Sequence, residues 1–362
     1  MLRPPWRRRS VARHLSLCLS LRRILLSLLL VLVLGVLATA AGAWWWVHAQ
    51  LKLTTPAPVD LSVEPGMRPR AVAQTVRQAG VDVDAQWLFW WFRLSGDARA
   101  IRAGSYEIEA GATPASLLRK LTRGEESLQA LVLVEGWNFR QVRAAMAREP
   151  SLRQDTRGLS DAQVMEQLGR PGVAPEGRFF PDTYTYGKGA SDLSVLARAL
   201  KAMDRKLQAA WYARAEGIAV TDAQQMLILA SIVEKETGQP SDRPLISAVF
   251  HNRLRLGMPL QTDPTVIYGM GERFDGNLRK RDLQEDTPWN TYTRRGLPPT
   301  PIAMPGQAAL LAAVQPAASR ALYFVARGDG SSQFSESLEA HNRAVDQYQR
   351  NPGRASSGTK TP

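Results

Sequence analysis

One carboxylate stands out in this sequence because of the residues around it. Residues 227–236 read LILASIVEKE, an almost wholly apolar stretch with Glu234 near its end. In a helix, Glu234 shares one face with Ser231 and two apolar residues. Burial on that face would raise the pKa of the carboxyl, as a general acid working near neutral pH requires. A frayed polar helix end is the other interpretation of the same pattern.

The second acid of this stretch, Glu236, points about 200° around the helix axis from Glu234. It therefore leaves the apolar face. We expect Glu236 to be solvated or paired with Lys235.

Two later segments are rich in amides, hydroxyls and aromatic rings, namely residues 260–269 and 288–302. Such side chains bind sugar hydroxyls and N-acetyl groups through hydrogen bonds and ring stacking. Ordinary turn chemistry is the alternative for each residue taken singly. The candidates for substrate binding are Gln261, Thr262, Asp263, Asn290 and Tyr292.

Elements that could position these residues are visible along the chain. A capping sequence at Thr221 predicts a helix that ends near Gly238, and apolar periodicity predicts neighbouring helices on both sides. Upstream, a strand-like run followed by Glu, Gly and a helix-like pattern occurs three times. The copies begin at Leu61, Tyr106 and Leu131. This arrangement predicts an α+β fold.

The aromatic run between the first two copies, residues 87–92, reads WLFWWF. We expect a buried helix there. An exposed aromatic platform for sugars is the alternative.

Composition excludes several mechanisms. The single cysteine, Cys18, leaves the rest of the chain without thiol chemistry, and the presence of only four histidines argues against a metal site. No nucleophile elbow, phosphate-binding loop or zinc-protease motif occurs. The net charge of +13 includes seven arginines within residues 1–23, so the remainder gives no sign of a nucleic-acid partner.

The N-terminal region predicts a membrane anchor. Residues 24–46 are uncharged and rich in Leu and Val, long enough to span a bilayer, and they end in three tryptophans. The arginines before them predict a cytoplasmic N-terminus and export of everything that follows. The alternative is a cleaved signal peptide, because residues 38–40 and 41–43 are small enough for a cleavage site.

The predicted organisation has six parts. They are a basic cytoplasmic arm (1–23), a transmembrane helix (24–46), a linker (47–58), a first subdomain (59–126), a second domain (127–350) and a disordered tail (351–362).

Five motifs resemble the endolytic murein transglycosylase family, also called YceG-like. They are GRFFPDTY (177–184), ASIVEKETG (230–238), VFHNRLRLGMPLQTDPTVIYG (249–269), WNTYTRRGLPPTPIAMPG (289–306) and LYFVARGDG (322–330). The resemblance implies a LysM-like α/β subdomain and then a mixed α+β catalytic domain, behind one N-terminal transmembrane helix. One departure is visible: the stretch around Ser332 lacks the His that the family usually has after this glycine turn.

The resemblance also implies a reaction. Glu234 would protonate the glycosidic oxygen between N-acetylmuramic acid and N-acetylglucosamine. It would then take the proton of the 6-hydroxyl, which leaves a 1,6-anhydro end. One carboxylate suffices, because the sugar's own hydroxyl replaces water, whereas ordinary glycosidases need two. No metal or cofactor is required.

The implied setting is the bacterial inner (cytoplasmic) membrane, with a single pass and the catalytic domain on the periplasmic, extracytoplasmic side. The implied partners are peptidoglycan glycan strands and the membrane, with peptidoglycan synthases as further candidates. Placed there, the enzyme would end the elongation of nascent strands.

Two other hypotheses remain. A non-catalytic glycan-binding scaffold of the cell-wall synthesis machinery would not depend on Glu234. A true hydrolase would use Asp263 as its second carboxylate and leave reducing ends.

Overall fold

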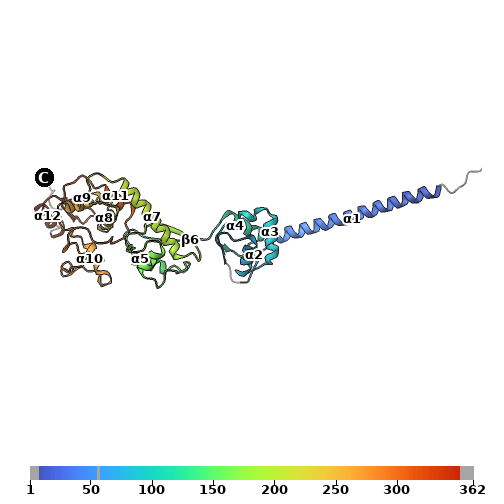
Figure 1. Ribbon diagram of the computed structural model, residues 1–362, viewed down its shortest axis with the longest axis horizontal. Coiled ribbons are helices and arrows are strands. Elements are labelled where there is room, and N and C mark those ends of the chain that lie inside the picture. Colours follow the sequence, from blue (N-terminus) through green and yellow to red (C-terminus); the bar gives the residue numbers. More distant parts are fainter. Residues whose placement is uncertain (1–7, 55–57, 351–362) are drawn as a thin grey trace, which may run out of the picture. The chain divides into compact units, whose positions relative to one another are not determined.

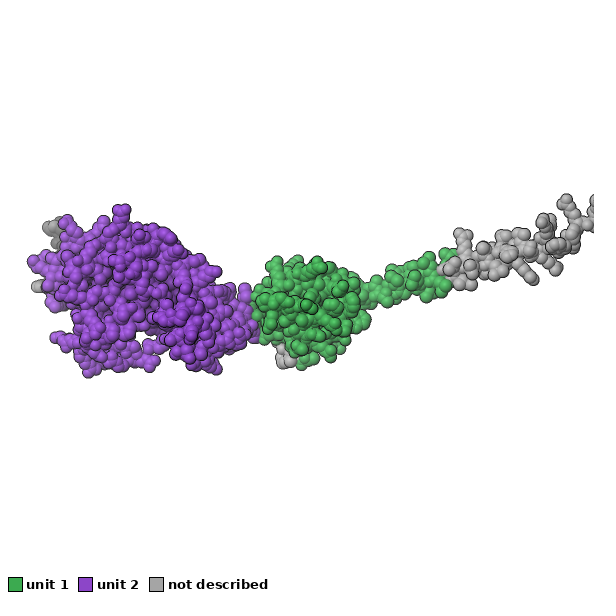
Figure 2. All heavy atoms as spheres, in the orientation of Figure 1, with its two compact units in different colours: residues 1–127 green, residues 128–362 purple. Residues whose placement is uncertain are grey.

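The computed structural model describes residues 8–54 and 58–350. The chain divides into two compact units, unit 1 (Met1–Ser127) and unit 2 (Leu128–Pro362), which Figure 2 shows in green and purple. Each unit mixes helices with short antiparallel strands, so the expected α+β class of the chain is confirmed. The predicted tail, 351–362, and the first seven residues of the predicted arm lie outside the described residues.

Unit 1 begins with one long helix, α1 (Arg8–His48), labelled in Figure 1. Within it, residues Leu26–His48 are apolar and long enough to cross a membrane, with a mean hydropathy of 2.5. The exposed large apolar side chains in this segment run from Leu26 to Trp45, as expected of a lipid-facing helix, whereas Val47 is buried. The predicted span, 24–46, overlaps this segment closely.

The rest of unit 1 packs three helices against two small sheets. The elements are β1 (Lys52–Leu53), β2 (Val59–Val63), α2 (Pro69–Gln78), β3 (Val81–Asp82), α3 (Ala85–Leu94), a 3-10 turn (Asp97–Ala100), β4 (Gly104–Ile108) and α4 (Pro114–Arg123). Strand β2 pairs with β4 and β1 with β3, both antiparallel. Alternate residues of β2 are buried, which gives the sheet one face in the core of the unit.

The predicted linker, 47–58, differs from the structure in its first half. Val47 is buried in the core of unit 1, and Lys52–Leu53 form a strand. The Leu51 amide also donates to the carbonyl of Ala112 at 2.7 Å. Apolar residues at alternate positions let this segment pair with β3 in a two-stranded sheet, although its prolines suggested a spacer. Residues 55–57 are not among those described.

The aromatic run forms helix α3, as predicted, but the helix is not buried all round. Leu88 and Phe92 lie in the core, whereas Trp87 and Trp90 are exposed. The expectation of a buried helix is therefore wrong for one of its faces, because no element of the described part of unit 1 covers it.

The three predicted strand, turn and helix copies are confirmed. They are β2 with α2, β4 with α4, and β5 (Leu128–Val132) with α5 (Phe139–Ala147). Each turn contains a glycine at positive φ, and these glycines are Gly66, Gly111 and Gly136. The first two copies pair with each other in unit 1, whereas β5 pairs with β6 (Thr183–Gly187) in unit 2.

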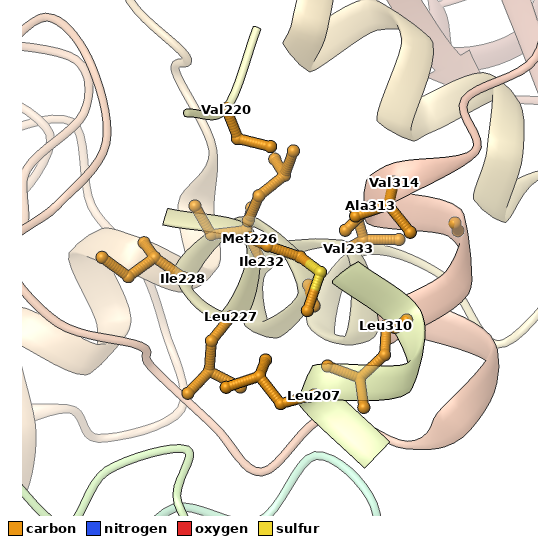
Figure 3. Packing of buried hydrophobic residues seen from close by; sticks show 14 of the residues in the cluster. Leu207, Val220, Met226, Leu227, Ile228, Ile232, Val233, Leu310, Ala313 and Val314 are labelled. Atoms are coloured by element: carbon orange, nitrogen blue, oxygen red, sulfur yellow. The ribbon is translucent and has the colours of Figure 1, made fainter. Parts of the chain in front are cut away.

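Unit 2 is built around one buried helix, α8 (Ala223–Glu236), whose residues 226–233 are all buried. Helices α7 (Asp192–Tyr212), α9 (Arg243–Arg255), α10 (Asp263–Met270) and α11 (Gln307–Val314) pack against it. Figure 3 shows side chains of α7, α8 and α11 interlocking in this core. Helix α8 is capped by Asp222, which accepts from the Gln225 amide at 2.8 Å, one residue later than the predicted Thr221.

Smaller elements complete unit 2. They are α6 (Asp161–Gln167), a 3-10 turn (Gly271–Arg273), β7 (Tyr323–Ala326), β8 (Ser332–Ser335), α12 (Leu338–Val345) and a π-helical turn (Asp346–Arg350). Strands β7 and β8 form an antiparallel hairpin.

Candidate active site

Glu234 lies in the last turn of α8, and its side chain is only 6% exposed. One carboxyl oxygen, Oε2, accepts a hydrogen bond from the Gly306 amide at 3.0 Å. The other, Oε1, lies 3.8 Å from Nη2 of Arg243. Burial raises the pKa of Glu234, and the nearby carboxylate of Glu135 raises it further, whereas the Gly306 hydrogen bond and Arg243 oppose this. The carboxyl has the partly desolvated environment expected of a general acid.

The apolar face of α8 also positions the segment that meets Glu234. The Ser231 hydroxyl accepts from the Ile302 amide at 3.0 Å. Met304 then pairs through its backbone with Gly136 at 2.9 Å and Trp137 at 2.7 Å. These hydrogen bonds bring Gly306, at the start of α11, to the carboxyl of Glu234.

A second acid, Glu135, lies beside the same glycine. A Cβ atom added at Gly306 would overlap the carboxyl of Glu135, so the acid packs directly against the glycine backbone. Glu135 and Glu234 thus both lie against Gly306. Sequence reasoning used Glu135 only as part of a recurring turn and missed its place beside the candidate acid.

Glu236 is not solvated, and the expectation for it is wrong. Its carboxyl accepts a hydrogen bond from the Thr262 hydroxyl. Burial raises its pKa to about 7, with Asp263 adding to this and Arg253 opposing it. The segment at 260–263 covers the end of α8 on this side, which the periodicity of one helix does not reveal.

The predicted binding residues divide into accessible and buried groups. Gln261 is exposed and adopts a positive φ of 49°, rare for a residue with a side chain. Asp263 accepts a hydrogen bond from the Tyr292 hydroxyl at 2.6 Å. Burial and this contact with Asp263 raise the pKa of Tyr292, so its hydroxyl stays protonated.

Thr262 and Asn290 are buried. The amide group of Asn290 donates to the carbonyls of Leu283 and Glu285, and its oxygen accepts from the Tyr292 amide at 2.8 Å. Thr262 holds Glu236, as described above. The structure therefore brings Thr262, Asp263 and Tyr292 together around Glu236, with Asn290 supporting Tyr292 from behind.

A groove of about 1170 Å³ runs beside this region. Its lining includes Gly136 and Lys235, the neighbours of Glu135 and Glu234 in sequence. In Figure 2 the purple unit is hollowed on its lower edge, between the parts that carry α5 and α10 in Figure 1. Neither Glu234 nor any of the five predicted binding residues lines the groove itself, which reaches the end of α8 through Gly136 and Lys235.

Aromatic rings and a third buried acid line the groove. The rings of Tyr268 and Trp289 meet edge to face at 5.6 Å. Glu176 accepts a hydrogen bond from the Tyr268 hydroxyl at 3.1 Å. It also accepts one from the Phe139 amide at 3.2 Å, and this second bond satisfies a free N–H at the start of helix α5. Burial raises the pKa of Glu176 to about 7. Tyr268 and Trp289 lie in the two segments that the sequence singled out for sugar binding, although neither is among the five named candidates. Glu176 was not predicted, since its spacing in sequence carries no recognisable signal.

Ser332, where the family usually has a His nearby, is connected to the site through a backbone hydrogen bond. The Ser332 amide donates to Asp242 at 2.7 Å, and Asp242 immediately precedes Arg243. This contact needs no particular side chain at 332. Among the described residues, no cluster of three or more His, Cys, Asp or Glu side chains is arranged to hold a metal ion.

Comparisons with known proteins agree with this architecture. The sequence pattern of the YceG-like family matches residues 61–347. The endolytic murein transglycosylase of Bacillus subtilis (strain 168) is 31% identical over 307 residues, which cover 80% of this chain and 84% of that protein. A protein of the same name from Streptococcus pneumoniae is 27% identical over 323 residues, with 80% and 58% covered.

A crystal structure of a putative YceG-like protein from Listeria monocytogenes superposes with a TM-score of 0.50 at 27% identity. It covers 80% of this chain and 99% of its own. Fold and site together describe a mixed α+β protein that carries a partly desolvated glutamate beside a groove. This chain belongs to the YceG-like family.

Proposed function

We propose that this chain is a membrane-anchored endolytic lytic transglycosylase of peptidoglycan. The observation that carries the proposal is the environment of Glu234, a buried carboxyl of raised pKa at the end of a core helix and beside a groove. The names of the relatives from B. subtilis and S. pneumoniae support the substrate class.

In the proposed reaction, Glu234 acts first as acid and then as base. Its proton passes to the glycosidic oxygen between N-acetylmuramic acid and N-acetylglucosamine, and the bond to the leaving sugar breaks. The resulting carboxylate accepts the proton of the muramic acid 6-hydroxyl, whose oxygen closes the 1,6-anhydro ring. The Gly306 amide would stabilise Glu234 in its charged intermediate state.

The accessible groups Gln261, Asp263 and Tyr292 are the proposed glycan contacts, and Tyr268 and Trp289 form an aromatic wall of the groove. Thr262 and Asn290 act through their neighbours, by holding Glu236 and Tyr292 in place. These roles follow from exposure, because Gln261 and Asp263 are exposed and Tyr292 is half-buried, whereas Thr262 and Asn290 are buried.

The proposed setting is the cytoplasmic membrane, with α1 as a single-pass anchor, its N-terminus in the cytoplasm and the chain after His48 outside. Residues 59–126 are the proposed LysM-like subdomain. An active site tethered in this way would meet glycan strands as they are made, beside the peptidoglycan synthases, and would end their elongation.

The decisive experiment incubates the full chain, in detergent micelles, with uncrosslinked glycan strands and analyses the products by mass spectrometry. Glu234→Gln keeps the shape of the side chain but has no proton to give. We expect it to lower the rate by at least about 100-fold, the usual contribution of a general acid. Glu166→Gln, an exposed acid on α6, is the matched control and should cleave at the native rate.

Each product has its own meaning. Anhydro-muramyl ends from the native chain alone support the proposal. Reducing ends would assign the chain to the hydrolases, and intact strands with a folded protein would favour the binding scaffold.

A further inference from the structure

Helix α3 presents two unlike faces. Leu88 and Phe92 lie in the core of unit 1, whereas Trp87, Trp90 and Leu94 are 64%, 51% and 79% exposed. The three exposed residues follow one another at helical spacing and therefore share one side of the helix. Large apolar side chains gathered in this way mark an interaction site. We call these three residues the α3 patch.

The α3 patch is continuous with the end of the apolar helix α1. The rings of Trp46 and Trp87 lie 6.1 Å apart, centre to centre. An apolar hollow of about 480 Å³ lies between the two helices and is lined from α1 by Ala43 and Trp46. On the same last turns of α1, Trp44 and Trp45 are exposed. Both helices belong to unit 1, so this surface is formed within one compact unit.

The position of the patch indicates what covers it. The apolar segment Leu26–His48 would cross the hydrocarbon of a bilayer, so its last turns reach the headgroup region. Tryptophan favours that depth because its ring is apolar and its N–H is polar. Because the α3 patch is continuous with those turns, we expect it to lie at the bilayer surface and to contact lipid.

The lining of the hollow argues against a sugar platform. Sugar sites combine aromatic rings with several polar groups that fix the hydroxyls. Here Gln86 is the one lining residue whose side chain is not an aliphatic or an indole group. The indole N–H of Trp91 already donates to the carbonyl of Pro114 at 3.2 Å.

We propose that Trp87, Trp90 and Leu94 insert into the membrane interface beside Trp44 and Trp45, so that unit 1 is seated on the lipid surface. This inference rests on the proposed anchoring by α1. The ligand is the headgroup and upper acyl region of the bilayer that α1 crosses. The seat would fix the orientation of unit 1, which a tether alone leaves free.

The test uses the full chain with Cys18→Ser and one introduced cysteine that carries an environment-sensitive fluorophore. The label stands at Gln86→Cys, beside the patch, or at Glu64→Cys, in the turn after β2, as the matched control. The labelled chains are reconstituted into vesicles of phosphatidylethanolamine and phosphatidylglycerol, with or without a lipid that bears a nitroxide quencher near its headgroup.

We expect the label at position 86, and not the one at 64, to emit at shorter wavelength and to be quenched by the nitroxide lipid. Trp87→Ser, Trp90→Ser and Leu94→Ser together should abolish that quenching, while the chain still floats with the vesicles through α1. This result would show that the α3 patch inserts into the membrane interface, independently of the attachment through α1.

Three results would overturn the proposal. An unquenched label at 86, in chains that float with the vesicles, removes the seat and leaves the anchor intact. A shorter emission wavelength without quenching by lipid shows that a protein surface, such as a second copy, covers the patch. Chains that are washed from the vesicles at alkaline pH show that the anchor itself fails.

Discussion

At the scale of single residues, the chemistry depends on how the proton of Glu234 is held. A general acid must be protonated in the free enzyme, so kcat/KM should fall as the pH rises through the pKa of Glu234. Burial and the charge of Glu135 raise that pKa. Both effects extend the active range toward neutral pH, and only the second can be removed by changing one surface residue.

We therefore predict that Glu135→Gln moves the alkaline limb of the pH profile to lower pH. Removing the negative charge of Glu135 stabilises the carboxylate of Glu234, which lowers its pKa and reduces the protonated fraction at a given pH. The measurement is kcat/KM against pH for the native chain, Glu135→Gln and the remote control Glu166→Gln. An unchanged limb, or an equal shift in the control, would show that Glu135 exerts no specific influence on the acid.

At the scale of elements, the site depends on a loop that packs tightly against another loop. Gly177 follows the buried Glu176 and has a φ of +77°. A Cβ atom at this position would lie 2.6 Å from Cβ of Pro301, in the segment that leads to Gly306. Gly189 has nearly the same backbone, with a φ of +80°, but open space around it. Substituting alanine at both glycines therefore distinguishes the cost of backbone strain, which both share, from the cost of steric overlap, which only Gly177 has.

We predict that Gly189→Ala costs about 1 kcal/mol, from the left-handed backbone alone. Gly177→Ala should cost about 1–3 kcal/mol more, because the rigid proline ring cannot move aside without shifting the loop. Thermal unfolding midpoints followed by near-ultraviolet circular dichroism give the comparison. Equal losses in the two variants would mean that the contact with Pro301 relaxes freely.

At the scale of the whole molecule, the apolar helix does not end where the folded part begins. Val47 is 6% exposed and belongs to the core of unit 1, although it is one residue from the end of α1. The helix that would anchor the chain therefore contributes to the stability of unit 1. A soluble version that starts at residue 49 would lack part of its own core.

We predict that Val47→Ser destabilises the full chain by about 1–3 kcal/mol, through lost apolar burial and a buried hydroxyl. Val132→Ser, at a site on β5 that is 52% exposed, makes the same chemical change in unit 2 and should cost well under 1 kcal/mol. Hydrogen exchange on the full chain in micelles would localise each loss to its unit. A similar small effect at both positions would show that α1 does not contribute to the stability of unit 1.

Features that depend on neighbours along the chain could be predicted from the sequence. The apolar run of α8, the apolar segment in α1 and the three strand, turn and helix copies all follow from local periodicity and turn chemistry. The five motifs likewise indicate the YceG-like family, because each is a continuous run of residues. The predicted roles of Glu234 and of the binding residues remain predictions until the proposed variants are measured.

The segments that cover the two sides of the end of α8 became evident from the packing of the folded chain. It placed Glu135 beside Gly306 and Glu234, buried Glu236 under Thr262, and paired Lys52–Leu53, expected to lie in a linker, with β3. It also left one face of α3 exposed. The physical reason is that burial, and with it the pKa of a carboxyl, depends on segments distant in sequence, whereas periodicity reports only the face on which a side chain lies.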